Sequence, residues 1–126
     1  MRPMGDIQGT FRVKRIYEPP ADDDGFRVLV DRLWPRGMPK EGAAVDLWLK
    51  DVAPSTELRK EFNHRPEQFA GFSERYRLEL DTNTAVETLL ELARAHPRIT
   101  LLYAARNTEA NNAHVLLDYL RGRAAG

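Results

Sequence analysis

Two short, continuous apolar runs constrain the fold of this chain more than any other feature. One lies within residues 26–31, FRVLVD, and the other lies within residues 98–104, RITLLYA. Their length favours strands over helices, and the lack of alternation with polar residues is typical of strands that are covered on both faces. Such strands occupy the centre of parallel sheets, so the two runs predict an α/β protein.

Amphipathic segments with helical periodicity accompany these strands. Phe69, Phe72, Tyr76 and Leu80 recur at intervals of three and four within residues 66–80, which predicts a helix whose aromatic stripe belongs to the core. Further helices are expected over residues 54–62, 82–97 and 106–122, and a further strand is expected over residues 11–17. The expected fold is therefore a single compact α/β domain with a central, mostly parallel sheet flanked by helices.

The length of 126 residues corresponds to one ordinary domain. We expect residues 1–10 to be a flexible N-terminal lead-in and residues 11–122 to form the single α/β domain. Residues 18–25, EPPADDDG, are expected to be a turn with solvated aspartates. Residues 45–52 alternate in a way that suits either a short strand or a turn of helix, and the pattern leaves both open.

The charge balance and the lack of cysteine exclude several classes of function. Nineteen basic and nineteen acidic side chains give a net charge of zero, which argues against a general attraction to nucleic acid or to anionic lipid. Without cysteine the chain has no disulfide and no thiolate nucleophile. Residues 1–10 lack the apolar stretch of a signal peptide, and no run is long enough to cross a bilayer, so a cytoplasmic protein is expected.

Polar side chains follow both predicted central strands, at the point where each strand ends. The first group comprises Asp31, Arg32, Trp34 and Arg36, and the second comprises Tyr103, Arg106, Asn107, Asn111 and Asn112. In open α/β sheets, ligands bind beyond the carboxyl ends of the strands. If the two strands are parallel and close together, both groups converge on one cleft.

The residue types in these two groups suit an anionic or nucleotide-like small molecule. Arginine offers a planar donor fork for phosphate or carboxylate, and a helix beginning near Thr108 would offer free N–H groups. Trp34 and Tyr103 are candidates for stacking, and asparagine amides both donate and accept hydrogen bonds. A second anion contact is expected at the start of the helix near residue 56, from Lys50, Ser55, Thr56 and Arg59.

Three functional hypotheses remain open on these residues. The first is an enzyme in which Asp31 acts as the acid/base group on a phosphate-bearing molecule. The second is a non-catalytic ligand-binding or adaptor module, and the third, less favoured by the charge balance, is a nucleic-acid accessory protein. No cofactor or metal is expected, because the three histidines lack ligand spacing and no Walker loop or GxGxxG motif is present. Taken singly, each polar residue also suits a purely structural role.

Three motifs in this sequence closely resemble a bacterial family of unknown function, the YeaO-like proteins of the DUF488 group. The motifs are VLVDRLWPRG, LWLKDVAPSTELRKEF and ITLLYAARNTEANNAHVLL, and the resemblance spans about residues 11–121. It implies a compact, soluble, single-domain α/β protein, and it carries no established activity. Within the family pattern the matching positions are Asp31, Arg32, Trp34, Pro35, Arg36 and Gly37, then Lys50, Pro54, Ser55, Thr56, Leu58 and Arg59, then Tyr103, Ala104, Asn111 and Ala113.

The sequence departs from the family pattern at two positions. Ala110 stands where many relatives have histidine, and Asn112 stands where some have histidine. If those histidines carry protons in relatives, this chain lacks the corresponding groups. The resemblance therefore weakens the enzyme hypothesis for this protein.

Overall fold

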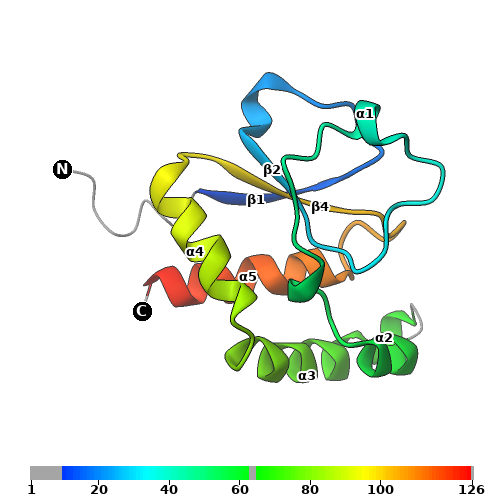
Figure 1. Cartoon of the computed structure of the whole chain (residues 1–126). Coiled ribbons are helices and arrows are strands. Elements are labelled where there is room, and N and C mark those ends of the chain that lie inside the picture. The colour runs from blue at the N-terminus through cyan, green and yellow to red at the C-terminus, as the bar shows by residue number, and fades with distance from the viewer. Residues whose placement is uncertain (1–9, 63–64, 126) are drawn as a thin grey trace.

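The computed structural model describes residues 10–62 and 65–125 and contains a four-stranded sheet packed against helices (Figure 1). The strands lie in the order β1 (Phe11–Arg15), β4 (Ile99–Tyr103), β2 (Phe26–Leu29) and β3 (Leu47–Trp48). Every neighbouring pair is parallel, so the predicted α/β class with a parallel sheet is confirmed. The expected lead-in, residues 1–10, lies outside the described residues except for Thr10.

The longer helices cover one face of this sheet, and the short helix α1 and connecting segments cover the other. The α-helices are α1 (Lys40–Ala43), α2 (Thr56–Phe62), α3 (Phe69–Asp81), α4 (Ala85–Ala95) and α5 (Asn112–Ala125), and the 3₁₀ turns are η2 (Asp22–Asp24), η3 (Lys50–Val52) and η4 (Pro66–Gln68). In Figure 1, α3, α4 and α5 lie below the sheet, whereas α1 and the β1–β2 connection lie above it. Within the described residues, no helix has both the length and the apolar character required to cross a bilayer.

The two continuous apolar runs occupy the centre of the sheet because each has a cover on both faces. All five residues of β4 are buried. Leu101 packs in the core between the sheet and helices α3, α4 and α5, and the next residue, Leu102, packs with Leu29 in a second cluster on the opposite face. The second cluster also contacts Trp34 and Trp48. The burial of successive residues on opposite faces explains why the runs do not alternate with polar residues.

Two segments of the chain each contain two secondary-structure elements in succession. Residues 45–52 contain both structures that the pattern left open, since β3 is followed directly by the 3₁₀ turn η3. The helix predicted over residues 66–80 begins as η4 and continues as α3. Its predicted stripe is confirmed, because Phe72, Tyr76 and Leu80 are buried and Phe69 packs against the same core.

The last helix begins later and ends later than the sequence pattern predicts. The expected cap at Asn107 or Thr108 and the expected end at Gly122 are both wrong, since α5 spans Asn112–Ala125. The Asn107 side-chain oxygen accepts the backbone N–H groups of Glu109 and Ala110 and closes a tight turn there. A capping residue of this type also stabilises turns, so the pattern alone does not distinguish the two outcomes.

Gly25 enters β2 with φ +66°, and a Cβ at this position would lie 2.3 Å from the backbone oxygen of Arg98. That oxygen accepts the Phe26 N–H at 2.9 Å, so it cannot withdraw without loss of a hydrogen bond. We expect Gly25→Ala to destabilise the protein by about 3 kcal/mol, through backbone strain and steric overlap.

Urea unfolding of Gly25→Ala beside Gly71→Ala tests this expectation. Gly71 lies within α3 with no atom near the added methyl group, so alanine there should stabilise the protein by up to about 1 kcal/mol. Equal unfolding midpoints for the two variants would show that the close approach at Gly25 is absent in solution.

Candidate functional site

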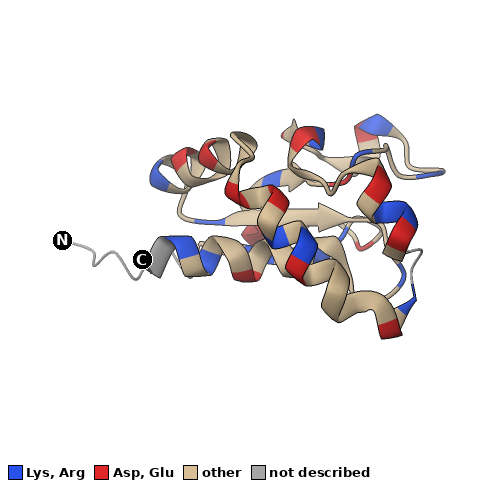
Figure 2. Ribbon diagram, turned by 90° about the horizontal axis from the view of Figure 1, so that it is seen from below, with Lys and Arg blue, Asp and Glu red and all other residues tan. Residues whose placement is uncertain are grey.

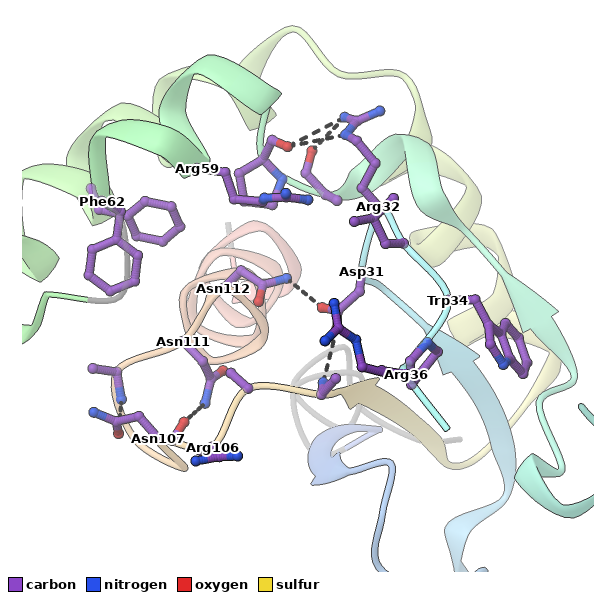
Figure 3. A pocket seen from close by; sticks show the side chains of 18 of the residues that line it. Asp31, Arg32, Trp34, Arg36, Arg59, Phe62, Arg106, Asn107, Asn111 and Asn112 are labelled. Carbon is purple, nitrogen blue, oxygen red and sulfur yellow. Dashed lines mark hydrogen bonds between the residues drawn. The ribbon is translucent and has the colours of Figure 1, made fainter. Parts of the chain in front are cut away.

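A cavity of about 710 Å³ opens at the carboxyl ends of β2 and β4 (Figure 3). Its lining comes mainly from residues 31–36 after β2, from Ala53 and Pro54 before α2 with Arg59 and Phe62 on that helix, and from residues 104–107 and 110–112 after β4. Because β2 and β4 are parallel neighbours, the segments that follow them reach the same edge of the sheet. The geometric condition that the sequence analysis placed on a shared cleft is therefore met.

The structure brings most of the candidate residues to this one pocket. Those that line it are Asp31, Arg32, Trp34, Arg36, Arg59, Arg106, Asn107, Asn111 and Asn112. Four others, Lys50, Ser55, Thr56 and Tyr103, do not line it. The lining residues divide into those that hold the loops in place and those that leave a charged group facing the pocket.

Asp31 holds four elements of the fold together. Its Oδ2 accepts the Ala104 N–H at 2.9 Å, and its Oδ1 accepts the Asn112 side-chain amide at 3.2 Å. Its backbone oxygen accepts the Trp48 indole N–H at 2.8 Å. The residue thus links the end of β2 to β3, to the segment after β4 and to the start of α5. Its carboxylate is engaged in fastening the pocket floor.

Arg32 and Trp34 position the loop after β2. The Arg32 guanidinium donates to the Ala53 oxygen at 3.3 Å and to the Pro54 oxygen at 3.4 Å, which ties the loop to the segment before α2. The Trp34 indole N–H donates to the Met38 oxygen at 2.8 Å, and in Figure 3 the ring points away from the centre of the pocket. Trp34 also packs edge-on against Trp48. These contacts give Trp34 a structural role, whereas the sequence predicted that its ring would stack on a ligand.

The start of α5 faces the pocket. Asn111 is buried, its side-chain oxygen accepts the His114 N–H at 3.0 Å, and its amide donates to the Asn107 oxygen at 2.9 Å. Asn111 therefore caps the helix, whereas the sequence pattern predicted a cap at Asn107 or Thr108. Figure 3 shows α5 nearly end-on behind the pocket. The partial positive charge of the helix N-terminus adds to the field in the cavity.

Three guanidinium groups face the pocket from three separate segments. Arg36 follows β2, Arg59 lies on α2, and Arg106 follows β4, and all three are exposed. Within residues 10–62 and 65–125, none of the three has a hydrogen bond or ion pair from its side chain. Asp31 is the only acidic residue among the described residues of the lining. The pocket is thus strongly positive on a protein whose net charge is zero.

The candidate residues outside the pocket have other partners. Ser55 donates its backbone N–H and its hydroxyl to the Glu79 carboxylate, and its hydroxyl oxygen accepts the Leu58 N–H as the cap of α2. Tyr103 is buried in the core, and this burial raises the pKa of its phenol. Lys50 lies over the Trp48 ring at 5.2 Å, and Thr56 is an exposed residue at the start of α2.

The apolar part of the lining was not predicted from the sequence. This part includes Tyr17, Leu33, Pro54, Phe62 and Phe72. Tyr17 follows β1, which is parallel to β4, so the strand-end rule that selected the other residues also applies to it. Leu33 lies within the first polar motif. The sequence pattern places Phe62 and Phe72 in the core. Such a pattern does not show that a core residue also borders a cavity.

The pocket lies within a region that matches a known family over almost the whole chain. The family model described as "Inactive DUF488-N3 subclade" matches residues 10–125. The chain belongs to this DUF488 family. The resemblance noted from the three sequence motifs is therefore confirmed.

Curated relatives agree with this assignment. The chain is 48% identical over 109 residues to the uncharacterized protein YeaO of Escherichia coli, covering 86% of this chain and 94% of YeaO. It is 45% identical over 112 residues to the uncharacterized proteins Rv3073c of Mycobacterium tuberculosis and Mb3100c of Mycobacterium bovis, covering 89% of this chain and 94% of each relative. No solved structure matches the chain.

Proposed function

We propose that this DUF488 protein binds a small anionic molecule in the pocket at the carboxyl ends of β2 and β4, without transforming it. The observation that carries this proposal is the charge of the lining, which contains four arginines and a single aspartate among the described residues. The Arg36, Arg59 and Arg106 side chains reach the pocket without an ion-pair partner within residues 10–62 and 65–125. A phosphate or carboxylate group would supply the missing negative charge.

Three observations favour binding over catalysis. The Asp31 carboxylate, the acid/base group of the enzyme hypothesis, is held by the Ala104 N–H and the Asn112 amide. Ala110 and Asn112 supply no titratable group at the pocket. The matching family model is described as inactive. Asp31 is thus proposed here as a positioning residue.

A role in nucleic-acid binding has less support than a role in binding a small molecule. Blue and red segments alternate along the helices in Figure 2, and both colours also occur in the connecting loops. Nucleic-acid binding draws on basic residues spread along a face or stripe. Three arginines of this protein, Arg36, Arg59 and Arg106, instead line one cavity.

Isothermal titration with inorganic pyrophosphate at low salt tests the proposal. We expect saturable binding to the wild-type protein, and about tenfold weaker binding to Arg36→Gln and to Arg106→Gln, because each removes one charged hydrogen-bond donor. Arg94→Gln is the matched control, since Arg94 is an exposed arginine on α4 outside the pocket.

Two results would count against the proposal. One is that the protein binds neither pyrophosphate nor simple organic phosphates and carboxylates. The other is an affinity that falls equally for Arg94→Gln and Arg106→Gln, which would indicate a general surface effect. Recovery of unchanged pyrophosphate after long incubation, measured by phosphorus NMR, is the expected outcome for a protein that binds without catalysis.

A further inference from the structure

The pocket has two chemically different parts. The lining carries the Arg36 and Arg106 guanidinium groups, and it also carries apolar side chains that include Leu33, Phe62 and Phe72. Figure 3 shows Phe62 on one side of the pocket and Arg36 on the other. A ligand that fills the cavity therefore meets both guanidinium groups and apolar side chains.

The apolar part is incompletely covered by the protein. Among the described residues, the exposed large hydrophobic side chains are Tyr17, Leu33 and Leu78, with exposed fractions of 39%, 62% and 67%. Two of these three, Tyr17 and Leu33, line the pocket. Single exposed apolar side chains are ordinary, but these two border the same charged cavity, where a ligand with an apolar group could cover them.

The size of the cavity also argues for more than a bare anion. Its volume of about 710 Å³ lies within the range of roughly 300 to 1,000 Å³ that is typical of pockets for small organic ligands. A free phosphate ion would engage the arginines and leave the exposed Leu33 side chain in contact with water. A ligand with an attached apolar group would cover both parts.

The geometry of α2 favours a flat ring as that apolar group. Arg59 and Phe62 are three residues apart on this helix, so they project from the same face, and both line the pocket. The Phe62 ring stacks on Phe72 with centroids 4.6 Å apart, which makes the wall aromatic. Aromatic rings pack well on such a wall, and a guanidinium plane stacks on a ring face.

Resting on the proposed function, we infer that the ligand is an aromatic acid, a planar ring joined to a phosphate or carboxylate group. The acidic group lies at Arg36 and Arg106, and the ring lies against Leu33 and Phe62 beside the Arg59 guanidinium. The phosphate and the carboxylate share the chemistry that the arginines recognise.

Two matched pairs of probes test this inference by isothermal titration. Phenyl phosphate is compared with methyl phosphate, and phenylacetate is compared with acetate. We expect at least one phenyl compound to bind about tenfold more tightly than its methyl partner, because the ring removes apolar surface from water. The pair with the larger advantage identifies the acidic group.

Variants separate the failure of this inference from failure of the proposed function. Leu33→Ser should remove most of the phenyl advantage and leave methyl phosphate affinity unchanged, whereas Arg106→Gln should weaken both phosphates equally. Leu78→Ser is the control, since Leu78 is an equally exposed leucine outside the pocket. Equal affinities within each pair would overturn the aromatic-acid inference while the anion site stands. If none of the probes binds, both the aromatic-acid inference and the proposed anion-binding function are wrong.

Discussion

Replacing Asp24 with alanine is expected to destabilise the protein by about 3 to 5 kcal/mol. Asp24 has an exposed fraction of 1%, and its carboxylate accepts hydrogen bonds from Arg27, Lys14 and the Ala21 N–H. The Arg27 side chain is itself buried, with an exposed fraction of 4%. Removal of the carboxylate leaves this guanidinium with uncharged partners alone, and an uncompensated buried charge is costly.

Chemical unfolding in urea provides the measurement, and Asp22→Ala provides the control. Asp22 lies in the same 3₁₀ turn and is exposed, so its loss should change the free energy of unfolding by less than about 0.5 kcal/mol. A loss of under about 1 kcal/mol for Asp24→Ala would show that water reaches the Arg27 guanidinium in the folded protein.

The same carboxylate predicts a dependence of stability on pH. Burial by itself would raise the pKa of Asp24, but the Ala21 N–H, Lys14 and Arg27 outweigh burial and hold the pKa below its ordinary value. A group whose pKa is lowered by folding stabilises the folded state above its unfolded pKa, which is about 3.9 for aspartate, and that stabilisation is lost as the pH falls. We therefore expect the stability gap between wild type and Asp24→Ala to be constant above about pH 5 and to shrink below pH 4.

Phe72→Ala is expected to cost about 3 to 5 kcal/mol, as a large-to-small change in the core. Phe72 is 4% exposed, and its ring contacts Phe62, Phe69 and Tyr76 within the cluster beneath the sheet. The substitution removes the centre of this aromatic group and leaves a cavity that the rigid neighbours cannot fill.

Leu78→Ala is the matched control for this change, because Leu78 lies on the same helix with an exposed fraction of 67%. Its free energy of unfolding should change by less than about 1 kcal/mol, chiefly through the small difference in helix propensity. Similar losses for the two variants would mean that the buried face of α3 has been assigned to the wrong residues.

The sequence predicted those residues of the candidate site that directly follow the central strands. Asp31 and Arg106 follow strands whose continuous apolar runs predict central positions. Their approach to one sheet edge required in addition that the two strands be parallel neighbours, which β2 and β4 are. The hydrogen-bond partners of each side chain could not be predicted in this way. Ser55 and Glu79 are distant in sequence, and their contact arises only when α2 packs on α3.

The acidic triplet illustrates the same limit. Residues 22–24 are three consecutive aspartates, and the local pattern predicts that all three are solvated. Asp22 and Asp23 are exposed, but Asp24 is buried, so the prediction is wrong for this residue. The Lys14 and Arg27 charges that compensate it come from β1 and β2. No local signal distinguishes one aspartate from its neighbours.

Local patterns by themselves determined the α/β class, the buried strands and the core stripe of α3. This is possible because the spacing of apolar residues along the chain depends on whether one face or both faces of an element are buried. Tertiary structure alone decided that Asp31 fastens the pocket floor, that Asp24 is buried, and that Leu33 borders the arginines. Each of these depends on atoms brought together from distant parts of the chain. Hydrogen bonds and ion pairs between such segments depend on three-dimensional distance, which a linear pattern does not contain.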